Sequence, residues 1–270
     1  MKTTRQSSSS PASVISKTRF LQGLQCPKLL WSAYNAKHLF PPVDAATQAV
    51  FDQANEVGGL AKRMFPSGIE IDTQPSDFQG AIQMTHNALP LRLPVFEAAF
   101  SANGGYARAD ILNPVGQDEW DLIEVKSTTR TKDVHVPDIA FQHWVLTAAG
   151  IKIRRCVLCH INNGFIRSSE VNPQKFFTRH DITSEVSAIS HSIGEQVRKM
   201  QDIIQLPECP KIQIGKHCDS PSTCPLHDHC WAFLPPQNVL ELYHDNKGRG
   251  FDLLNRGVLR LADIPADYPL

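Results

Sequence analysis

The sequence lacks an excess of either charge and lacks any long apolar run. Its 270 residues include 27 Lys and Arg and 27 Asp and Glu, so the formal net charge is zero. This balance gives no global electrostatic signal for nucleic acid, although a few clustered basic side chains can still form a local groove. No stretch of about 18 apolar residues occurs, so we predict no transmembrane helix and no membrane partner.

The N-terminal stretch MKTTRQSSSSPAS has no apolar segment either, so it does not have the form of a secretory signal. Its polar composition predicts a disordered tail over residues 1–15. We therefore expect a cytoplasmic protein. In a reducing compartment, its seven cysteines favour metal ligands or buried thiols over disulfides.

The rest of the composition is ordinary for a globular protein, with 41% hydrophobic and 20% charged residues. After the tail, we expect a core over residues 16–206 that begins with a helical segment. A Cys-rich region over residues 207–270, ending in short helical pieces, is expected to pack on this core.

The periodicity of apolar residues predicts an α/β (α+β) core with a mixed central sheet. Three strands form a meander, and the Asn103-Gly104-Gly105 sequence is typical of the first hairpin turn. A helix then precedes a fourth strand, and this crossover favours parallel pairing. The expected strands are 94–100, 106–112, 119–125 and 151–161; the expected helices begin after Ser16, restart at Pro27, and span 46–65, 78–88, 138–149 and 183–205.

Carboxylates occur on the three meandering strands, at Glu97, Asp110 and Glu124. An ionised carboxylate on a buried strand is costly unless it is paired or bound to a metal. Converging carboxylates also raise each other's pKa, and a hard cation such as Mg²⁺ or Mn²⁺ would remove the conflict.

Glu124 and Lys126 are two residues apart on a strand, so both side chains point to the same face. A metal-bound carboxylate beside an ammonium is suited to hydrolysis, because the metal activates water and the lysine stabilises charge. The alternative is a structural ion pair at the strand end, which is the commoner explanation for an isolated Glu-x-Lys pattern.

The RAD sequence at 108–110, EVK at 124–126 and the following helix with Gln142 together resemble the PD-(D/E)XK nuclease superfamily. The likeness is greatest to its RecB-type and CRISPR-associated exonuclease branch. This resemblance implies a restriction-endonuclease-like core and a Mg²⁺- or Mn²⁺-dependent deoxyribonuclease that acts on DNA ends or single strands. Across residues 16–265, the chain is also similar to an uncharacterised bacterial group of nuclease-like proteins.

The same resemblance implies a role for each matching residue. Asp110 and Glu124 would bind the metal together with the Val125 carbonyl. Lys126 would be catalytic, and Gln142 would support the site or the DNA end. Glu97 matches an acidic residue that stands one strand earlier and joins the catalytic and metal set.

Two departures from the family pattern leave a second hypothesis open. The branch usually carries a metal-binding histidine on the helix before the strands, and NEVGGLAKRM has none. The tyrosine usually found four residues after the glutamine is Leu146 here. The chain would then be a catalytically weak nuclease fold that holds nucleic acid or a protein partner.

Hydroxyl and basic side chains follow Lys126 along the chain. Next to a metal site they are expected to contact phosphates, and a solvated loop is the alternative. The predicted substrate-binding residues are Arg108, Ser127, Thr128, Arg130 and Lys132.

Cys218, Cys224 and Cys230 are regularly spaced in a Pro- and His-rich segment that is typical of a soft-metal site. The fourth ligand is Cys26, Cys209 or one of three histidines, at positions 217, 227 and 229. The nuclease resemblance implies Cys26 and a structural 4Fe-4S cluster, because the iron–sulfur members place one cysteine before the core and three after it. The iron–sulfur members usually have two C-terminal cysteines separated by two residues, and this pair is absent here. Zinc is therefore the alternative metal, and a structural protein stapled by zinc is the corresponding alternative function.

Overall fold

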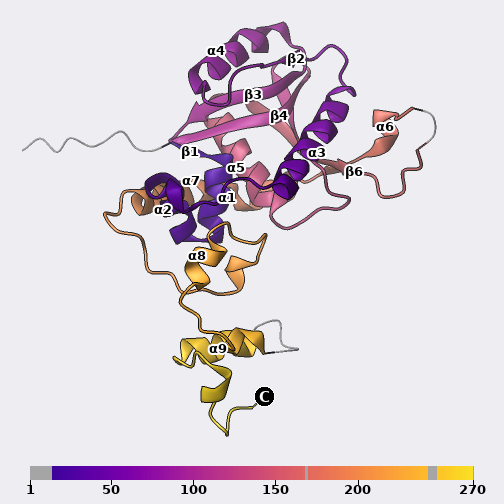
Figure 1. Cartoon of the computed structure of the whole chain (residues 1–270). Helices are drawn as coiled ribbons and strands as arrows, with labels where there is room; N and C mark the ends of the chain where they lie inside the picture. Colours follow the sequence, from indigo (N-terminus) through magenta and orange to yellow (C-terminus); the bar gives the residue numbers. More distant parts are fainter. Residues whose placement is uncertain (1–13, 168–169, 243–247, 270) are drawn as a thin grey trace, which may run out of the picture. The chain divides into compact units, whose positions relative to one another are not determined.

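The computed structural model describes residues 14–167, 170–242 and 248–269 (Figure 1). The chain divides into two compact units. Unit 1 contains residues up to Gln22 and Pro42–Leu206, and unit 2 contains Gly23–Pro41 and Pro207–Leu270. The tail expected at 1–15 lies outside the described residues as far as position 13. Its last residue departs from the prediction, because Ile15 is buried and pairs in a strand.

Unit 1 is built on a mixed sheet, as the sequence predicted, and this arrangement is consistent with a restriction-endonuclease-like core. Within the described ranges, seven strands join in the order β2-β3-β4-β5-β6-β7, with β1 paired to β4. The β3-β4-β5 meander is antiparallel, and β5 and β6 are parallel. The strands are β1 (Ile15–Ser16), β2 (Ile69–Glu70), β3 (Val95–Ala102), β4 (Gly105–Val115), β5 (Glu119–Lys126), β6 (Lys152–Ile161) and β7 (Phe177–Asp181).

The turn between β3 and β4 shows how local chemistry sets the register of the sheet. Asn103 and Gly104 both adopt positive φ, at 51° and 79°, which a two-residue type I′ hairpin requires. Ala102 pairs with Gly105 directly beside the turn, so the register of the whole hairpin follows from it.

The long predicted helices are present. In unit 1, α3 is capped by Asp44, whose carboxylate accepts a hydrogen bond from the Thr47 backbone N–H. It ends before Pro66, and α5 begins three residues earlier than the sequence suggested. The helices are α1 (Lys17–Gln25), α2 (Pro27–Asn35), α3 (Ala45–Lys62), α4 (Phe78–Ala88), α5 (His135–Ala148), α6 (Pro173–Phe176), α7 (Thr183–Ile204), α8 (His227–Trp231) and α9 (Gly248–Asn255).

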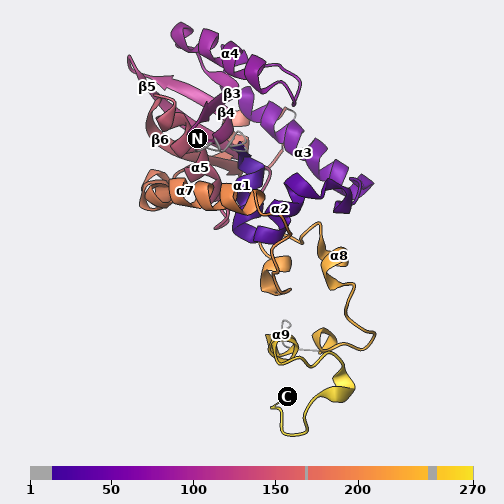
Figure 2. The same ribbon diagram turned by 90° about the vertical axis from the view of Figure 1, so that its left-hand side faces the viewer.

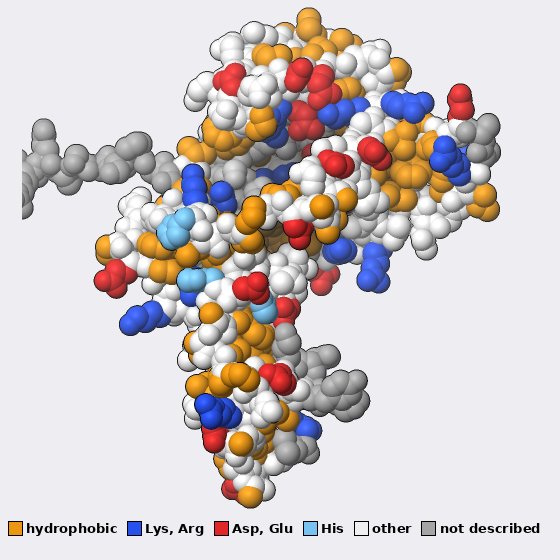
Figure 3. Space-filling view, in the orientation of Figure 1, with side chains coloured by type: hydrophobic (Ala, Val, Ile, Leu, Met, Phe, Trp, Pro, Cys, Tyr) orange, Lys and Arg blue, Asp and Glu red, His pale blue; other side chains and the backbone are white. Residues whose placement is uncertain are grey.

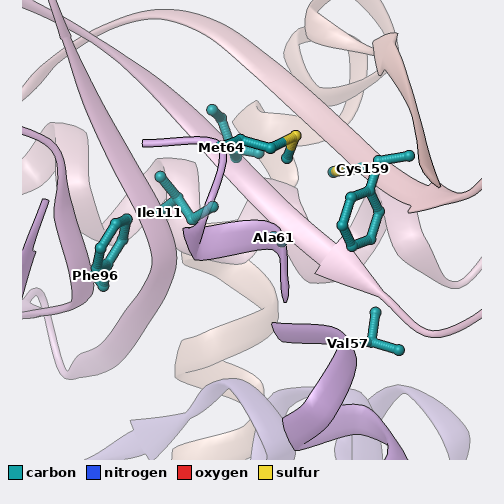
Figure 4. Close-up of a cluster of buried hydrophobic side chains, with 8 residues drawn as sticks. Val57, Ala61, Met64, Phe96, Ile111 and Cys159 are labelled. Carbon is teal, nitrogen blue, oxygen red and sulfur yellow. The ribbon is translucent and has the colours of Figure 1, made fainter. Parts of the chain in front are cut away.

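Helices α3 and α5 cover opposite faces of the sheet (Figures 1 and 2). Val57 and Ala61 of α3, and Met64 just after it, pack on alternate strand residues, which include Ile111 and Phe96 (Figure 4). Their neighbours in sequence point to the other face, where Glu124 contacts α5. The central strands are therefore buried on both faces. The candidate site lies where Glu124 occupies a buried position of β5 that would otherwise be apolar.

Unit 2 joins two segments that are far apart in sequence. Cys26 and Leu29 pack with Cys224 and Leu226 in one apolar cluster. The Gln25 Nε2 group donates to the His217 carbonyl at 2.9 Å, which fixes the two segments together. Across the described portion of both units, the helices are too short or too polar to span a membrane.

Candidate active site

Strands β4 and β5 part at the candidate site. Their pairing runs from Val115↔Glu119 to Ile111↔Ile123 and stops there. Beyond that point the side chain of Asp110 replaces a backbone partner from β4, because its Oδ2 accepts a hydrogen bond from the Val125 backbone N–H at 2.7 Å. The carboxylate therefore occupies the gap between the two strands, beside Glu124.

Glu124 is almost fully buried, with 1% of its side chain exposed. Its Oε1 accepts from Lys126 Nζ at 2.6 Å and from Lys17 Nζ at 2.9 Å, and its Oε2 accepts from Gln142 Nε2 at 2.7 Å. Burial acts to raise the pKa of Glu124, but the two lysines outweigh it and hold that pKa well below its ordinary value. Glu124 is therefore ionised at neutral pH.

Asp138 fixes Lys126 from the opposite side. Lys126 Nζ lies 2.5 Å from Asp138 Oδ2, and Gln142 Nε2 donates to Asp138 Oδ1 at 3.1 Å. Burial alone would lower the pKa of Lys126, yet Glu124 and Asp138 raise it well above its ordinary value. Lys126 is thus a fixed ammonium at neutral pH.

Asp110 carries the least compensated negative charge of the group. Burial and repulsion from Glu124 raise its pKa to about 7, against the opposing effect of Lys17 and Lys126. A cation placed next to Asp110 and Glu124 would relieve this repulsion.

Glu97 lies opposite Asp110 in the sheet register, between the pairs Phe96↔Ile111 and Ala98↔Ala109. Its φ of 56° is unusual for a residue with a side chain and costs roughly 1–3 kcal/mol. Its carboxylate lies 3.2 Å from Lys62 Nζ of α3 and 3.9 Å from Arg108 Nε. Glu97 therefore reaches the site, where it pairs with cations.

A cavity of about 420 Å³ opens beside these carboxylates. Figure 3 shows a hollow in the surface beside α3, with acidic and basic side chains near its rim. One wall is the α3 surface at Asn55, Gly58 and Gly59. The remaining lining residues are Ala54, Lys62, Glu97, Asp110, Ile111, Glu124 and Val125.

The predicted substrate-binding residues do not line this cavity. Arg108 Nη2 donates to the Ile71 carbonyl at 2.8 Å, which ties its guanidinium to the backbone. Thr128 Oγ1 donates to the Arg130 carbonyl at 2.9 Å, and Ser127 follows Lys126 directly. Arg130 and Lys132 are exposed in the loop that leads to α5. Contacts between this loop and phosphate stay a prediction.

Two residues of the site were missed in the sequence. Asp138 lies one helical turn before Gln142, so the i, i+4 spacing on α5 was an available signal. Lys17 reaches Glu124 across 107 residues of sequence, and no local pattern separates it from an ordinary surface lysine of a helix.

Asp110 and Glu124 offer the oxygen donors that Mg²⁺ or Mn²⁺ prefers, but their present positions do not form a complete coordination shell. In the part of the chain that the structure describes, no three His, Cys, Asp or Glu side chains are grouped closely enough to hold a metal. Asp110 and Glu124 nevertheless line one cavity and repel each other. Gln142 Oε1 is buried, and among the described residues it has no hydrogen-bond partner, so it would accept from a water or substrate donor.

The cysteine site lies within unit 2. Cys26, Cys218, Cys224 and Cys230 line one small cavity of about 20 Å³. Burial raises the pKa of Cys26, and burial with neighbouring thiols raises the pKa of Cys224 to about 11. Thiols crowded in this way suit a soft metal that would hold them as thiolates. The four thiols therefore suit an iron–sulfur cluster or zinc by donor type, although in the described residues no three of them are grouped closely enough to hold a metal as they stand.

The other cysteines have different surroundings. Cys156 and Cys159 are fully buried in unit 1, and burial raises the pKa of each to about 12. Cys209 lines a separate cavity of about 710 Å³, which Cys230 also borders.

No protein-family model matches this sequence, and no curated protein matches it either. Among solved structures, the crystal structure of SSO0001 is similar over 85% of this chain and 91% of its own, at 15% identity and a TM-score of 0.40. LHK-Exo in complex with dAMP is similar over 72% of this chain and 91% of its own, at 10% identity and a TM-score of 0.31.

An alkaline exonuclease (LHK-Exo) from Laribacter hongkongensis is similar over 71% of this chain and 93% of its own, at 10% identity and a TM-score of 0.25.

Proposed function

We propose that this chain is a metal-dependent nuclease that hydrolyses phosphodiester bonds in DNA, at ends or in single strands. One observation carries the proposal. Asp110, Glu124, Lys126 and Gln142 come from β4, β5 and α5 and meet where two strands part, beside a cavity. A buried group of carboxylates and an ammonium at such a place is suited to charge stabilisation in hydrolysis.

Asp110, Glu124 and the Val125 carbonyl would hold Mg²⁺ or Mn²⁺. When bound, the ion supplies positive charge that polarises the scissile phosphate and makes a nearby water more acidic. The raised pKa of Lys126 keeps it a cation and a hydrogen-bond donor, rather than a base, at neutral pH. Its ammonium would donate a hydrogen bond to the attacking water or to a phosphate oxygen.

The neighbouring side chains hold these groups in position. Gln142 Nε2 donates to Oε2 of Glu124, which sets the plane of the carboxylate. Asp138 fixes the Lys126 ammonium between two carboxylates. Preorganisation of this kind lowers the cost of arranging charges during the reaction.

In unit 2, we propose that Cys26, Cys218, Cys224 and Cys230 hold a 4Fe-4S cluster with a structural role, with zinc as the alternative. All four thiols line one cavity, which supports this assignment. Thiolate ligands from two distant segments would join the halves of this unit.

Anaerobic purification, metal analysis and a nuclease assay with Mn²⁺ on single-stranded DNA, duplex DNA and RNA test the function. We expect DNA cleavage by the wild-type protein, and Lys126→Ala should abolish it while the fold and the cysteine-bound metal stay intact. Lys152→Ala, which removes an exposed lysine paired with Asp118, is the matched control and should cleave normally. Full cleavage by the Lys126→Ala protein would refute the assignment.

A catalytically weak nucleic-acid-binding module is the second candidate. The observation that favours it is that Lys17 and Lys126 already neutralise Glu124, so this carboxylate is stabilised without a metal ion. Titration with Mn²⁺ separates the two functions, because a binding module would hold DNA without binding the ion near Asp110 and Glu124.

A further inference from the structure

Two ammonium groups converge on one carboxylate oxygen at the candidate site. Lys126 and Lys17 both contact Oε1 of Glu124, at 2.6 Å and 2.9 Å. A carboxylate oxygen has two lone pairs, so these lysines use both positions on Oε1. Lys126 is two residues from Glu124 in β5, whereas Lys17 comes from the start of α1.

The two lysines are not held equally. Lys126 has a second carboxylate, Asp138, at 2.5 Å. Lys17 is 3.9 Å from Asp138, so its close contact is with Glu124. If Lys17 withdrew, Glu124 would still be paired with Lys126, and Lys126 would still be held at both ends. Lys17 is therefore the cation that can leave at the smaller cost.

The net charge of the site depends on whether Lys17 stays in contact with Glu124. When all three are ionised, Asp110, Glu124 and Asp138 carry three negative charges against the two lysines, which leaves one uncompensated negative charge. The neighbouring cations Lys62 and Arg108 are offset by Glu70 and Glu97. Without Lys17, two negative charges would remain in a buried setting, where Coulomb interactions are stronger than in water.

We propose that Lys17 is the internal counter-ion of Glu124 and competes with a divalent metal for this carboxylate, so that it sets the metal affinity of the site. Metal binding then involves withdrawal of the Lys17 ammonium from Oε1. The inference rests on the proposed function in one respect only, that Asp110 and Glu124 bind a divalent ion.

Binding of Mn²⁺ to the full chain, followed by the electron paramagnetic resonance signal of the free ion, tests the proposal. Lys17→Met should bind Mn²⁺ at least tenfold more tightly than the wild-type protein, because it removes the competing charge. Lys17→Arg, which keeps the charge, should bind no more tightly than wild type. Lys152→Met makes the same chemical change at an exposed ion pair and should leave the affinity unchanged.

Asp110→Asn identifies which binding belongs to this site, since it should remove the binding that Lys17→Met strengthens. Unchanged or weaker binding by Lys17→Met, with binding by wild type that depends on Asp110, overturns the inference and leaves the proposed function standing. If neither protein shows Asp110-dependent binding, both the proposed function and this inference fail.

Thermal unfolding with and without Mn²⁺ provides a second readout. Lys17→Met should be less stable than wild type in metal-free buffer, because Glu124 loses a counter-ion, and should gain more in melting temperature when Mn²⁺ is added. A variant that folds only when Mn²⁺ is present would support the inference strongly. A variant that stays unfolded in saturating Mn²⁺ would overturn it.

Discussion

At the scale of single residues, the position of Lys126 depends on a partner from another element. Its ammonium lies between Glu124 of β5 and Asp138 of α5. Asp138 does not line the cavity, so it would act on the reaction through the side chains that it contacts, chiefly Lys126 and Gln142 and more weakly Lys17.

Asp138→Asn should therefore lower kcat about 10- to 100-fold and leave KM nearly unchanged, as expected when a group that orients a catalytic residue is altered. Loss of the Asp138 charge also lowers the pKa of Lys126, so the alkaline limb of the pH–rate profile should move to lower pH. Steady-state kinetics across pH measure both effects. Asp118→Asn, at an exposed pair, is the control; a raised KM with unchanged kcat would contradict the positioning role.

His135 gives stability a dependence on pH. It is buried, and burial together with Lys126 and Lys132 lowers its pKa from 6.5 to about 4. Between about pH 4 and 6.5 the unfolded chain binds this proton and the folded chain does not, so stability rises with pH across that window. The contribution is roughly 3 kcal/mol above pH 6.5 and is lost as the pH falls towards 4.

Urea unfolding of wild type and His135→Asn at pH 5 and pH 7 measures this term. Asparagine offers an oxygen in place of the Nδ1 that accepts from the Lys132 N–H. The variant should lose less stability than wild type between pH 7 and pH 5. Equal losses in the two proteins would show that His135 is not the titrating group.

The sequence predicted the residues whose signal is local. Asp110, Glu124 and Lys126 stand out because charged groups interrupt apolar strands, and Gln142 follows from the resemblance. Lys17 could not be predicted, because its role depends on a contact 107 residues away. Whether these residues catalyse or bind metal stays a prediction until it is measured.

At the scale of elements, α3 combines a packing face with an open one. Val57 and Ala61 pack on the sheet, while Gly58 lines the cavity and has no atom within 4 Å of the place where a Cβ would stand. Glycine inside a helix is less stable than alanine by roughly 0.5–1 kcal/mol. The helix therefore gives up stability where it borders the cavity.

Gly58→Ala should raise the free energy of unfolding by about 0.5–1 kcal/mol, measured by urea titration. Gly116→Ala is a matched comparison, because it has equally open surroundings but a φ of 55°. There the same change should destabilise the protein, since alanine tolerates that backbone poorly. Gly58→Phe should raise KM for DNA if the substrate enters this cavity, and an unchanged KM would place the substrate elsewhere.

The elements that were predicted well are those in which the hydrophobic pattern continues over many residues. Strands β3, β4 and β5 have buried residues along most of their length, and α7 repeats buried residues at helical spacing. Strands β1 and β2 have two residues each, which is too short for any period to be detected. They form because neighbouring strands offer free edges, which is information that the local sequence does not contain.

At the scale of the whole molecule, the chain consists of two units with separate chemistry. The carboxylate site belongs to unit 1, and the four candidate thiol ligands belong to unit 2. The sequence predicted the change of composition after residue 206. Local patterns did not reveal that Gly23–Pro41 belongs with the C-terminal segment, because that depends on packing between distant residues, and only the resemblance grouped Cys26 with the later cysteines.

Cys26→Ser should remove most of the iron or zinc bound by the purified protein, and with iron it should remove the visible absorbance. Cys209→Ser is the matched control and should retain both, because Cys209 does not line the four-cysteine cavity. Elemental analysis after anaerobic purification measures the difference. Metal retained by Cys26→Ser and lost by Cys209→Ser would identify Cys209 as the fourth ligand.

The two-segment construction of unit 2 also has a consequence for synthesis. The hydrogen bond from Gln25 to His217 spans 192 residues, and contacts this distant form late because a long loop must first close. On the ribosome, Leu29 emerges early and waits for Leu226, while unit 1 is complete at Leu206 and is free to fold. The order of translation therefore sets an order of maturation, in which unit 1 can fold before the two segments of unit 2 meet.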